Sequence, residues 1–392
     1  MGRVSFFVWG VINRAVVRYE GMKGRRPYIV AGPCSVESRE QLGEVAQALA
    51  QVPQVGMVRC GVWKPRTHPG VFEGNGEEAL RWVAEVREMM TRPGTSECRK
   101  EDLGTYPATA WHPSQEGRGL RFCCEVARAE HVELALRYGM EGVWIGARTT
   151  ANPFVMKEVT EAMRGCGLTV MVKNAPSPDV QLWIGAVERC RQVGLRDVVA
   201  VHRGFDVFRN GGYRNNPLWE VPIELRRLEP ELPILCDPSH IAGRREPIAA
   251  LAQTAMDLGM DGLMVEVHPH PERALTDARQ QITPDELREL LEALVVRQTD
   301  STMADGQLQR LREEIDLLDG QLLQVLAARL GVASEIAKVK ERDNLAVYQP
   351  KRWEQVLQQR KLTAAELGLA TEFVEEIFEK IHAESVRVQL EN

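Results

Sequence analysis

A carboxylate and two imidazoles follow directly on an apolar segment of this sequence. The stretch "LMVEVHPHPERALTDARQQ" (263–281) places Glu266, His268 and His270 at the end of an apolar run, and Asp277 a few turn residues later. Any one of these residues suits a polar loop that leaves the core. Together they supply oxygen and nitrogen ligands of the kind that a divalent metal ion needs, so further ligands are expected elsewhere in the chain.

Other apolar segments also end on residues whose side chains could take part in catalysis or ligand binding. Such residues follow each of them in turn: Cys34, "KPRTHPG" (64–70), Glu125, Arg148, Lys173, Arg203, "DPSH" (237–240) and Glu266. One charged residue at the end of a strand means little. The repetition in a chain whose strands are otherwise apolar predicts a functional site, because stability alone does not require it.

The candidate site residues divide into two groups. The first offers sulfur, nitrogen and two carboxylates, a set suited to one Mn, Fe, Co or Zn ion: Cys34, His240, Glu266 and Asp277. The second is cationic: Lys64, Arg66, Arg148, Lys173 and Arg203. Since the whole chain has a net charge of −6, a cluster of cations predicts anionic substrates such as phosphates and carboxylates. A small core cysteine at position 34 and a ring of salt bridges are the structural alternatives.

The elements that must position these residues alternate between strand and helix patterns. Val- and Ile-rich runs predict eight strands, at 28–34, 55–62, 120–126, 142–147, 169–174, 197–202, 233–239 and 262–267. Helix-period stretches lie between them, and two of these end on Gly139 and Gly259, as helices often do. Eight β-α units in residues 28–296 predict an α/β fold of the (β/α)8 TIM-barrel type. An open, doubly wound sheet is the alternative, but no GxGxxG motif opens the first β-α turn.

The remaining segments do not follow the barrel pattern. Residues 308–392 have apolar residues three and four apart and predict a smaller all-α domain, after a polar linker at 297–307. Residues 1–27 are interpreted as an N-terminal packing extension. Residues 91–119 are expected to form an irregular insertion in the barrel, because they are rich in Gly and Pro and show no period.

Composition limits the partners and the compartment. A net charge of −6 and a pI near 5.9 argue against a nucleic-acid partner. No segment is apolar for long enough to span a membrane, so no membrane partner is expected. The eight cysteines form no CxxC pair, and several lie in apolar runs. This pattern favours reduced thiols and a cytoplasmic location.

Seven motifs of residues 28–290 carry a resemblance to a known family. They are "AGPCSVES", "KPRTHP", "WIGART", "VKNAPSPDVQLWIGA", "HRGF", "CDPSHIAGRR" and "VEVHPHPERALTDARQQ". In this order they resemble 3-deoxy-D-arabino-heptulosonate 7-phosphate (DAHP) synthase, of the subfamily related to 3-deoxy-D-manno-octulosonate 8-phosphate synthase. "KPRT" favours the heptulosonate enzyme, because its relative has a "KANRS"-like sequence at this place.

The resemblance implies a role for each candidate residue of the barrel. It implies metal ligation by Cys34, His240, Glu266 and Asp277, and phosphoenolpyruvate binding by Lys64, Arg148, Lys173 and Arg203. It implies erythrose 4-phosphate binding around Arg66 and Thr67. Lys64, Cys34 and His240 are the expected catalytic residues of the synthase.

Three motifs in the C-terminal segment resemble the all-helical chorismate mutase family. They are "LREEIDLLDGQLLQVLAARLGVASEIAKVK", "QPKRWEQVL" and "HAESVRVQ". The matching positions imply a chorismate- and prephenate-binding site made of Arg312, Arg329, Lys340, Arg352, Ser385 and Gln389, with Arg329, Lys340 and Gln389 catalytic. Two positions depart from the family: Gln349 stands where an aspartate is frequent, and Trp353 replaces a glutamate, which puts the ring-hydroxyl contacts of the site in doubt.

The resemblance leaves two interpretations of the helical domain. In the first, it is a working mutase, which makes the chain a bifunctional shikimate-pathway enzyme with feedback inhibition through this domain. In the second, it is a catalytically weak module that senses chorismate or prephenate and mediates dimerisation. Lys340 and Gln389 favour the first interpretation, because binding alone would not require two donors to the ether oxygen. Both interpretations include a homodimer through the helical domain, with Arg312 reaching into the partner's site.

Overall fold

The computed structural model describes residues 27–64, 70–91, 120–208, 211–297 and 306–391. The chain divides into two compact units, Met1–Thr299 and Asp300–Asn392, which are treated separately below. The predicted N-terminal extension (1–27), insertion (91–119) and linker (297–307) lie almost wholly outside the described residues.

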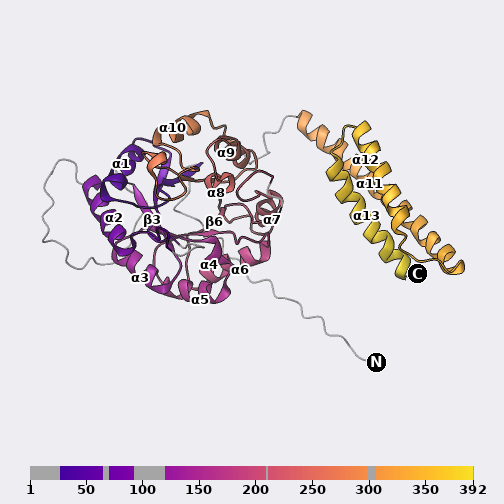
Figure 1. The fold of residues 1–392 in the computed structure, drawn as a ribbon, viewed down its shortest axis with the longest axis horizontal. Helices are drawn as coiled ribbons and strands as arrows, with labels where there is room; N and C mark the ends of the chain where they lie inside the picture. The colour runs from indigo at the N-terminus through magenta and orange to yellow at the C-terminus, as the bar shows by residue number, and fades with distance from the viewer. Residues whose placement is uncertain (1–26, 65–69, 92–119, 209–210, 298–305, 392) are drawn as a thin grey trace, which may run out of the picture. The chain divides into compact units, whose positions relative to one another are not determined.

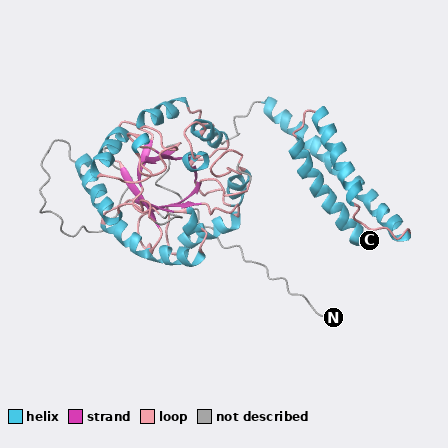
Figure 2. Ribbon diagram, viewed as in Figure 1, coloured by secondary structure: helices cyan, strands magenta, loops and turns pink. Residues whose placement is uncertain are grey.

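The strands of the first unit form a closed parallel barrel (Figures 1 and 2). In chain order they are β1 (Tyr28–Gly32), β2 (Val55–Cys60), β3 (Arg121–Val126), β4 (Gly142–Ile145), β5 (Thr169–Lys173), β6 (Val198–His202), β7 (Ile234–Cys236) and β8 (Gly262–Glu266). The first strand pairs with the last, from Tyr28 beside Gly262 to Gly32 beside Glu266. The predicted barrel is therefore confirmed, and the open sheet is excluded.

Helices surround the barrel as an outer ring (Figure 2). They are α1 (Arg39–Ala50), α2 (Gly76–Thr91), α3 (Ala129–Arg137), α4 (Ala147–Thr150), α5 (Pro153–Ala162), α6 (Val180–Gln192), α7 (Glu220–Leu228), α8 (Pro238–Ala242), α9 (Ile248–Asp257) and α10 (Pro284–Ala293), with a 3-10 turn η1 (Pro271–Arg273) after β8. Ser38 and Asp179 cap α1 and α6 through their side chains. Gly139 and Gly259 follow α3 and α9, as predicted, and adopt the left-handed conformation with φ of 69° and 75°.

The core has two layers that follow from the strand alternation. Val30, Trp144 and Met264 belong to a cluster that fills the barrel interior. Ile29 and Ala31 belong to the larger layer between the strands and the helices. Side chains on both faces are buried, which is why the strands read as continuous apolar runs.

Most strands are shorter than predicted at their C-terminal ends. For example, β1 ends at Gly32 and β7 at Cys236, whereas the sequence predicted strands to residues 34 and 239. The residues beyond these ends leave the ladder and carry polar groups at the barrel mouth. The strand-like sequence pattern continues past the last hydrogen bond between neighbouring strands. The pattern alone therefore cannot locate the C-terminal end of a strand.

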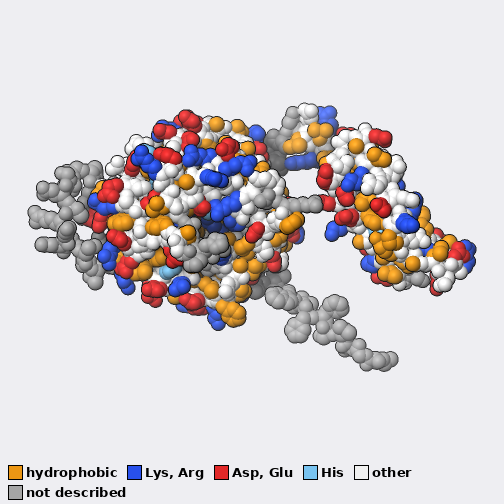
Figure 3. Space-filling model, viewed as in Figure 1, with side chains coloured by type: hydrophobic (Ala, Val, Ile, Leu, Met, Phe, Trp, Pro, Cys, Tyr) orange, Lys and Arg blue, Asp and Glu red, His pale blue; other side chains and the backbone are white. Residues whose placement is uncertain are grey.

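The described part of the second unit (306–391) forms three helices: α11 (Gly306–Arg342), α12 (Pro350–Glu366) and α13 (Thr371–Glu391). Helix α13 packs against both of the others. The unit buries few apolar side chains in one copy of the chain, among them Ala333, Ala337 and Val374. Many larger ones remain exposed on its surface (Figure 3). No helix among the residues described in either unit is long and apolar enough to cross a bilayer.

Candidate active sites

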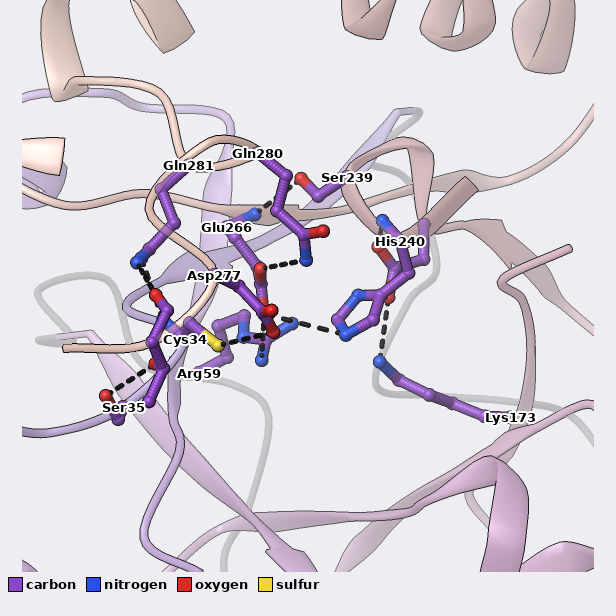
Figure 4. A network of polar contacts seen from close by, with 12 residues as sticks. Cys34, Ser35, Arg59, Lys173, Ser239, His240, Glu266, Asp277, Gln280 and Gln281 are labelled. Carbon is purple, nitrogen blue, oxygen red and sulfur yellow. Dashed lines mark hydrogen bonds and ion pairs between the residues drawn. The ribbon is translucent and has the colours of Figure 1, made fainter. Parts of the chain in front are cut away.

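Three of the four predicted metal ligands converge at the mouth of the barrel (Figure 4). Cys34 follows β1, Glu266 ends β8, and Asp277 comes from the segment after η1. One sulfur or oxygen atom from each lies within 4.8 Å of the others. The Cys34 thiol donates to Oδ2 of Asp277 across 3.3 Å. Residues 243 positions apart thus meet because β1 and β8 are neighbours in the closed barrel.

The fourth predicted ligand, His240, lies on α8 and turns its ring toward the same cluster. Its Nε2 is 3.7 Å from Oε1 of Glu266, and its Nδ1 is 2.8 Å from Oδ2 of Asp237. Asp237 also caps α8 through the backbone N–H of His240. A carboxylate behind a histidine fixes the orientation of the ring, as is usual for metal-binding histidines.

Glu266 is held by two side chains that sequence reasoning did not single out. Gln280 donates to its Oε2 across 2.6 Å, and the buried Arg59 guanidinium lies 3.0 Å from its Oε1 as an ion pair. Among the described residues, Oε1 makes no directed hydrogen bond although it is fully buried. A buried carboxylate oxygen in this state is suited to a metal ligand. The lone arginine within the apolar run of β2 was the signal in the sequence.

Backbone geometry also supports the cluster. A side chain at Gly61 would place its Cβ 1.7 Å from the carbonyl oxygen of Cys34, so only glycine permits this close approach. Asp277 has a φ of 46°, which is unusual for a residue other than glycine. Its carboxylate is held by Arg214 at 3.1 Å, and Arg214 also donates to Gln280 at 2.7 Å. Strained backbone of this kind tends to occur at functional sites.

The electrostatics of the cluster fit a bound cation. Burial, followed by the charge of Glu266, raises the pKa of Cys34 to about 12. Burial opposes ionisation of Asp277 as well, but Arg214 and His240 outweigh it and hold the pKa of that carboxyl below its usual range. A thiol, an imidazole and two carboxylates, one of which has a buried oxygen without a directed hydrogen bond, form a donor set that fits a borderline divalent ion. The residues present therefore fit the predicted metal.

Several of the predicted cations surround this cluster. The buried Lys173 pairs with Asp237 at 2.7 Å, and Arg203 donates to Asn215 at 2.7 Å. Burial lowers the pKa of Arg203 to about 10, and Arg148 and Arg214 are near enough to contribute to this shift. Basic side chains gather near the middle of the barrel face in view in Figure 3.

Lys64 belongs to the same group of cations. Burial opposes its charge, but Cys34 and Glu266 outweigh burial and raise its pKa. Arg66 and Thr67, the predicted erythrose 4-phosphate ligands, lie outside the described residues.

The histidines that opened the sequence argument do not join the metal ligands. Nε2 of His268 lies 3.7 Å from Glu37, and its Nδ1 accepts from the backbone of His270. His270 is half-exposed, near Glu44. Asp237 of the "DPSH" motif was not among the predicted site residues, although it pairs with Lys173 and contacts His240.

The helical unit gathers a second set of predicted residues between α11 and α13. Lys340 donates to Oε1 of Gln389 at 3.0 Å, and Arg329 donates to the hydroxyl of Ser385. Gln389 in turn donates to the backbone carbonyl of Ser385. The other two predicted residues, Arg312 and Arg352, are exposed, and neither hydrogen-bonds to this group within the described part of the chain.

Comparison with known proteins assigns the two units separately. Residues 16–303 match the family model of the DAHP synthetase I family, and residues 311–390 match that of chorismate mutase type II. The chain belongs to the DAHP synthetase I family and carries a chorismate mutase domain. It combines a synthase with a mutase, which makes it a bifunctional shikimate-pathway enzyme.

Individual relatives agree with this assignment. A phospho-2-dehydro-3-deoxyheptonate aldolase of Thermotoga maritima is 30% identical over 68% of each chain. A solved structure of a Thermotoga maritima protein with the same name has a TM-score of 0.55 and 26% identity, covering 69% of this chain and 68% of that one. A T-protein of Haemophilus influenzae is 38% identical over 20% of this chain, but the match spans only 21% of that protein.

Proposed function

We propose that the barrel condenses phosphoenolpyruvate with erythrose 4-phosphate to give DAHP and phosphate, with one divalent metal ion at Cys34, His240, Glu266 and Asp277. One observation carries this proposal. Ligand atoms of Cys34, Glu266 and Asp277 lie within 4.8 Å of one another, and buried cations such as Lys173 lie at the same barrel mouth. Bound there, the ion supplies a Lewis acid for the aldehyde oxygen. Apart from this, the condensation requires that two polyanionic substrates be held close together.

The residues of the chain supply that positioning. Lys64, Arg148, Lys173 and Arg203 hold the phosphate and carboxylate of phosphoenolpyruvate, while Arg66 and Thr67 bind erythrose 4-phosphate. Carbon 3 of phosphoenolpyruvate then attacks the aldehyde, water adds at carbon 2, and phosphate leaves. Asp237 keeps both the Lys173 ammonium and the His240 ring in place, since it contacts each within 2.8 Å.

The helical unit rearranges chorismate to prephenate. This pericyclic reaction needs no nucleophile, but it needs cations for two carboxylates and donors for the ether oxygen that becomes negative in the transition state. Arg329, Lys340 and Gln389 supply these groups, and the contacts of Arg329 and Lys340 with α13 hold them in one cluster. Gln349 is the N-cap residue of α12, its side chain makes no capping hydrogen bond, and its amide offers no carboxylate to a substrate.

A homodimer completes the helical unit. Exposed apolar side chains on α11 recur three, four or seven residues apart: Leu311, Ile315, Leu318, Leu322, Val325, Val332, Ile336 and Val339. This stripe is typical of a seam that a second helix covers. Arg312 lies 17 residues before Arg329 on α11, about 25 Å along a helix that rises 1.5 Å per residue, so it serves a different site from Arg329 within one chain. Leu322→Asp should convert dimer to monomer in sedimentation velocity.

Prephenate or chorismate bound to the helical domain inhibits the condensation. Support comes from the chain itself, which joins the first reaction of the pathway to a site for a later intermediate. Condensation rates measured with added prephenate test this, and rates unaffected at saturation would contradict it. The seven described cysteines are free thiols, which supports a cytoplasmic location.

The alternative is that the helical domain binds these metabolites and turns them over poorly. Gln349 and Trp353 favour it, because neither offers a carboxylate to the substrate. A paired assay of phosphoenolpyruvate consumption and chorismate loss, with and without chelator, decides between the two. The proposal expects chelator to stop only the first reaction. Loss of neither metabolite, or chorismate loss that needs metal, would contradict it.

A further inference from the structure

A histidine beside the mutase cluster has no role in the proposed reaction. His382 lies on α13, three residues before Ser385 and seven before Gln389, so the three side chains share one face of the helix. That face is turned toward Arg329 and Lys340, which contact Ser385 and Gln389. His382 therefore extends the row of polar side chains by one turn.

The imidazole of His382 is fixed by an aromatic neighbour. The ring of Trp353 on α12 stacks on it, with centroids 4.0 Å apart and planes within 9°, and Tyr348 lies 5.9 Å away at a tilt. Trp353 is the residue that replaces a glutamate of the mutase family. The substitution thus removes an acidic side chain and at the same place orients an imidazole.

One nitrogen of this ring is left without a partner. Among the described residues, nothing hydrogen-bonds to the buried Nε2 of His382. An unsatisfied buried polar atom destabilises the free protein, so a ligand that pairs with it gains affinity. Its neighbours are already committed: Ser385 accepts from Arg329 and donates to the carbonyl of Ile381, and Gln389 uses both ends of its amide.

The chemistry of the free nitrogen differs from that of the cations around it. Burial, and then the charges of Arg329 and Lys340, lower the pKa of His382, so the ring is neutral near pH 7. A neutral imidazole can accept or donate, whereas arginine and lysine only donate. The substrate of the proposed mutase has one polar group besides its carboxylates and ether oxygen, namely the ring hydroxyl.

Resting on the proposed mutase function, we propose that His382 binds the ring hydroxyl of the substrate through Nε2, and that Trp353 is the positioning residue that holds its ring. His382 does the work of the carboxylates that are absent at positions 349 and 353. His382 and Trp353 thus make the site selective for six-membered rings that carry a hydroxyl group, and they do not stabilise charge in the transition state.

The test compares kcat/KM for two substrates in the wild-type full chain and in matched variants. The substrates are chorismate and its analogue without the ring hydroxyl. His382→Leu should lower kcat/KM for chorismate about 10- to 100-fold, the loss expected when a neutral hydroxyl contact is removed, and leave the analogue within about threefold. His382→Gln, which keeps a polar nitrogen in reach, should recover part of the loss. Lys380→Ala, an exposed change on the same helix, should alter neither substrate.

Trp353→Leu should lower the chorismate-to-analogue ratio in the same direction by a few-fold, because the ring loses its orientation. Equal losses on both substrates in His382→Leu would show a structural role and overturn the inference. So would unchanged chorismate kinetics. If the wild-type chain binds chorismate without turning it over, the mutase proposal fails, and the same comparison measured by calorimetric affinity for the two compounds decides on His382 independently.

Discussion

The two units of this protein hold their charged side chains in opposite ways. In the barrel, Arg59, Glu266 and Asp237 are almost completely buried, and each is paired within the same chain. In the helical unit, Arg329, Lys340 and Gln389 are only half-buried, and the apolar seam beside them is exposed. The buried charges of the barrel cluster are thus paired within one chain, whereas the side chains of the helical cluster are partly exposed.

The difference follows from the fold. Parallel strands covered by helices bring eight chain segments to one rim, so ligands distant in sequence meet without a partner. Three helices provide too little core for this. The barrel should then respond to changes within one chain, and the helical unit to changes at its cluster and its seam.

The largest effect is expected at the barrel cluster. Cys34→Ala removes the only sulfur ligand and should lower the condensation rate about 1000-fold, since a catalytic metal contributes several kcal/mol to the transition state. The metal content after dialysis should fall in parallel, while chorismate turnover stays unchanged. Cys124→Ala, which removes another buried thiol from the core, is the matched control. Full metal content in the Cys34 variant would contradict the proposal that Cys34 is a metal ligand.

A comparable but smaller loss is expected from the helical cluster. Arg329→Ala should lower chorismate turnover about 100- to 1000-fold, the usual result when one preorganised donor is lost, with condensation unaffected. The control is Arg342→Ala on the same helix, whose guanidinium pairs with the adjacent Asp343. Chorismate kinetics that are the same in both variants would favour the sensing alternative.

The sequence predicted which residues meet at the barrel mouth better than it predicted which side chains hold them there. Cys34, His240 and Glu266 fall at or shortly after strand ends, and Asp277 follows in the segment after the last strand. Because strand order in the barrel is sequence order, their convergence could be inferred. Arg59 and Arg214 could not be, because their pairing depends on side-chain paths across the mouth. Gln280 was visible only as part of a motif. In the helical unit, the row from His382 to Gln389 was periodic, but the stacking of Trp353 needed the packing of α12 on α13.

Residues behind the ligands give a more graded test. Arg214 holds both Asp277 and Gln280, and Gln280 holds Glu266. Arg214→Leu should weaken metal affinity about 10- to 100-fold, as changes behind metal ligands generally do, without abolishing binding. Competition with a chromophoric chelator measures this. The control is Arg244→Leu, a neighbouring exposed arginine that is 3.5 Å from Glu246. Equal affinities in both variants would mean that Asp277 is oriented by its backbone alone.

The smallest effect expected is on stability, and it also separates the units. Burial lowers the pKa of His202 to about 3, while an unfolded histidine titrates near 6.5. Between these values the unfolded state binds a proton that the folded state excludes, so stability is complete above pH 6.5 and falls as the pH is lowered toward 3. From pH 7 to pH 5 this single group should remove about 2 kcal/mol from the unfolding free energy of the barrel.

His202→Gln should reduce the pH dependence of the unfolding free energy by that amount, in urea titrations that follow the barrel transition. The helical transition should change little with His202→Gln, because that side chain belongs to the barrel. A wild-type slope retained in the variant would assign the pH dependence to another group, such as His240, whose pKa is also lowered by burial.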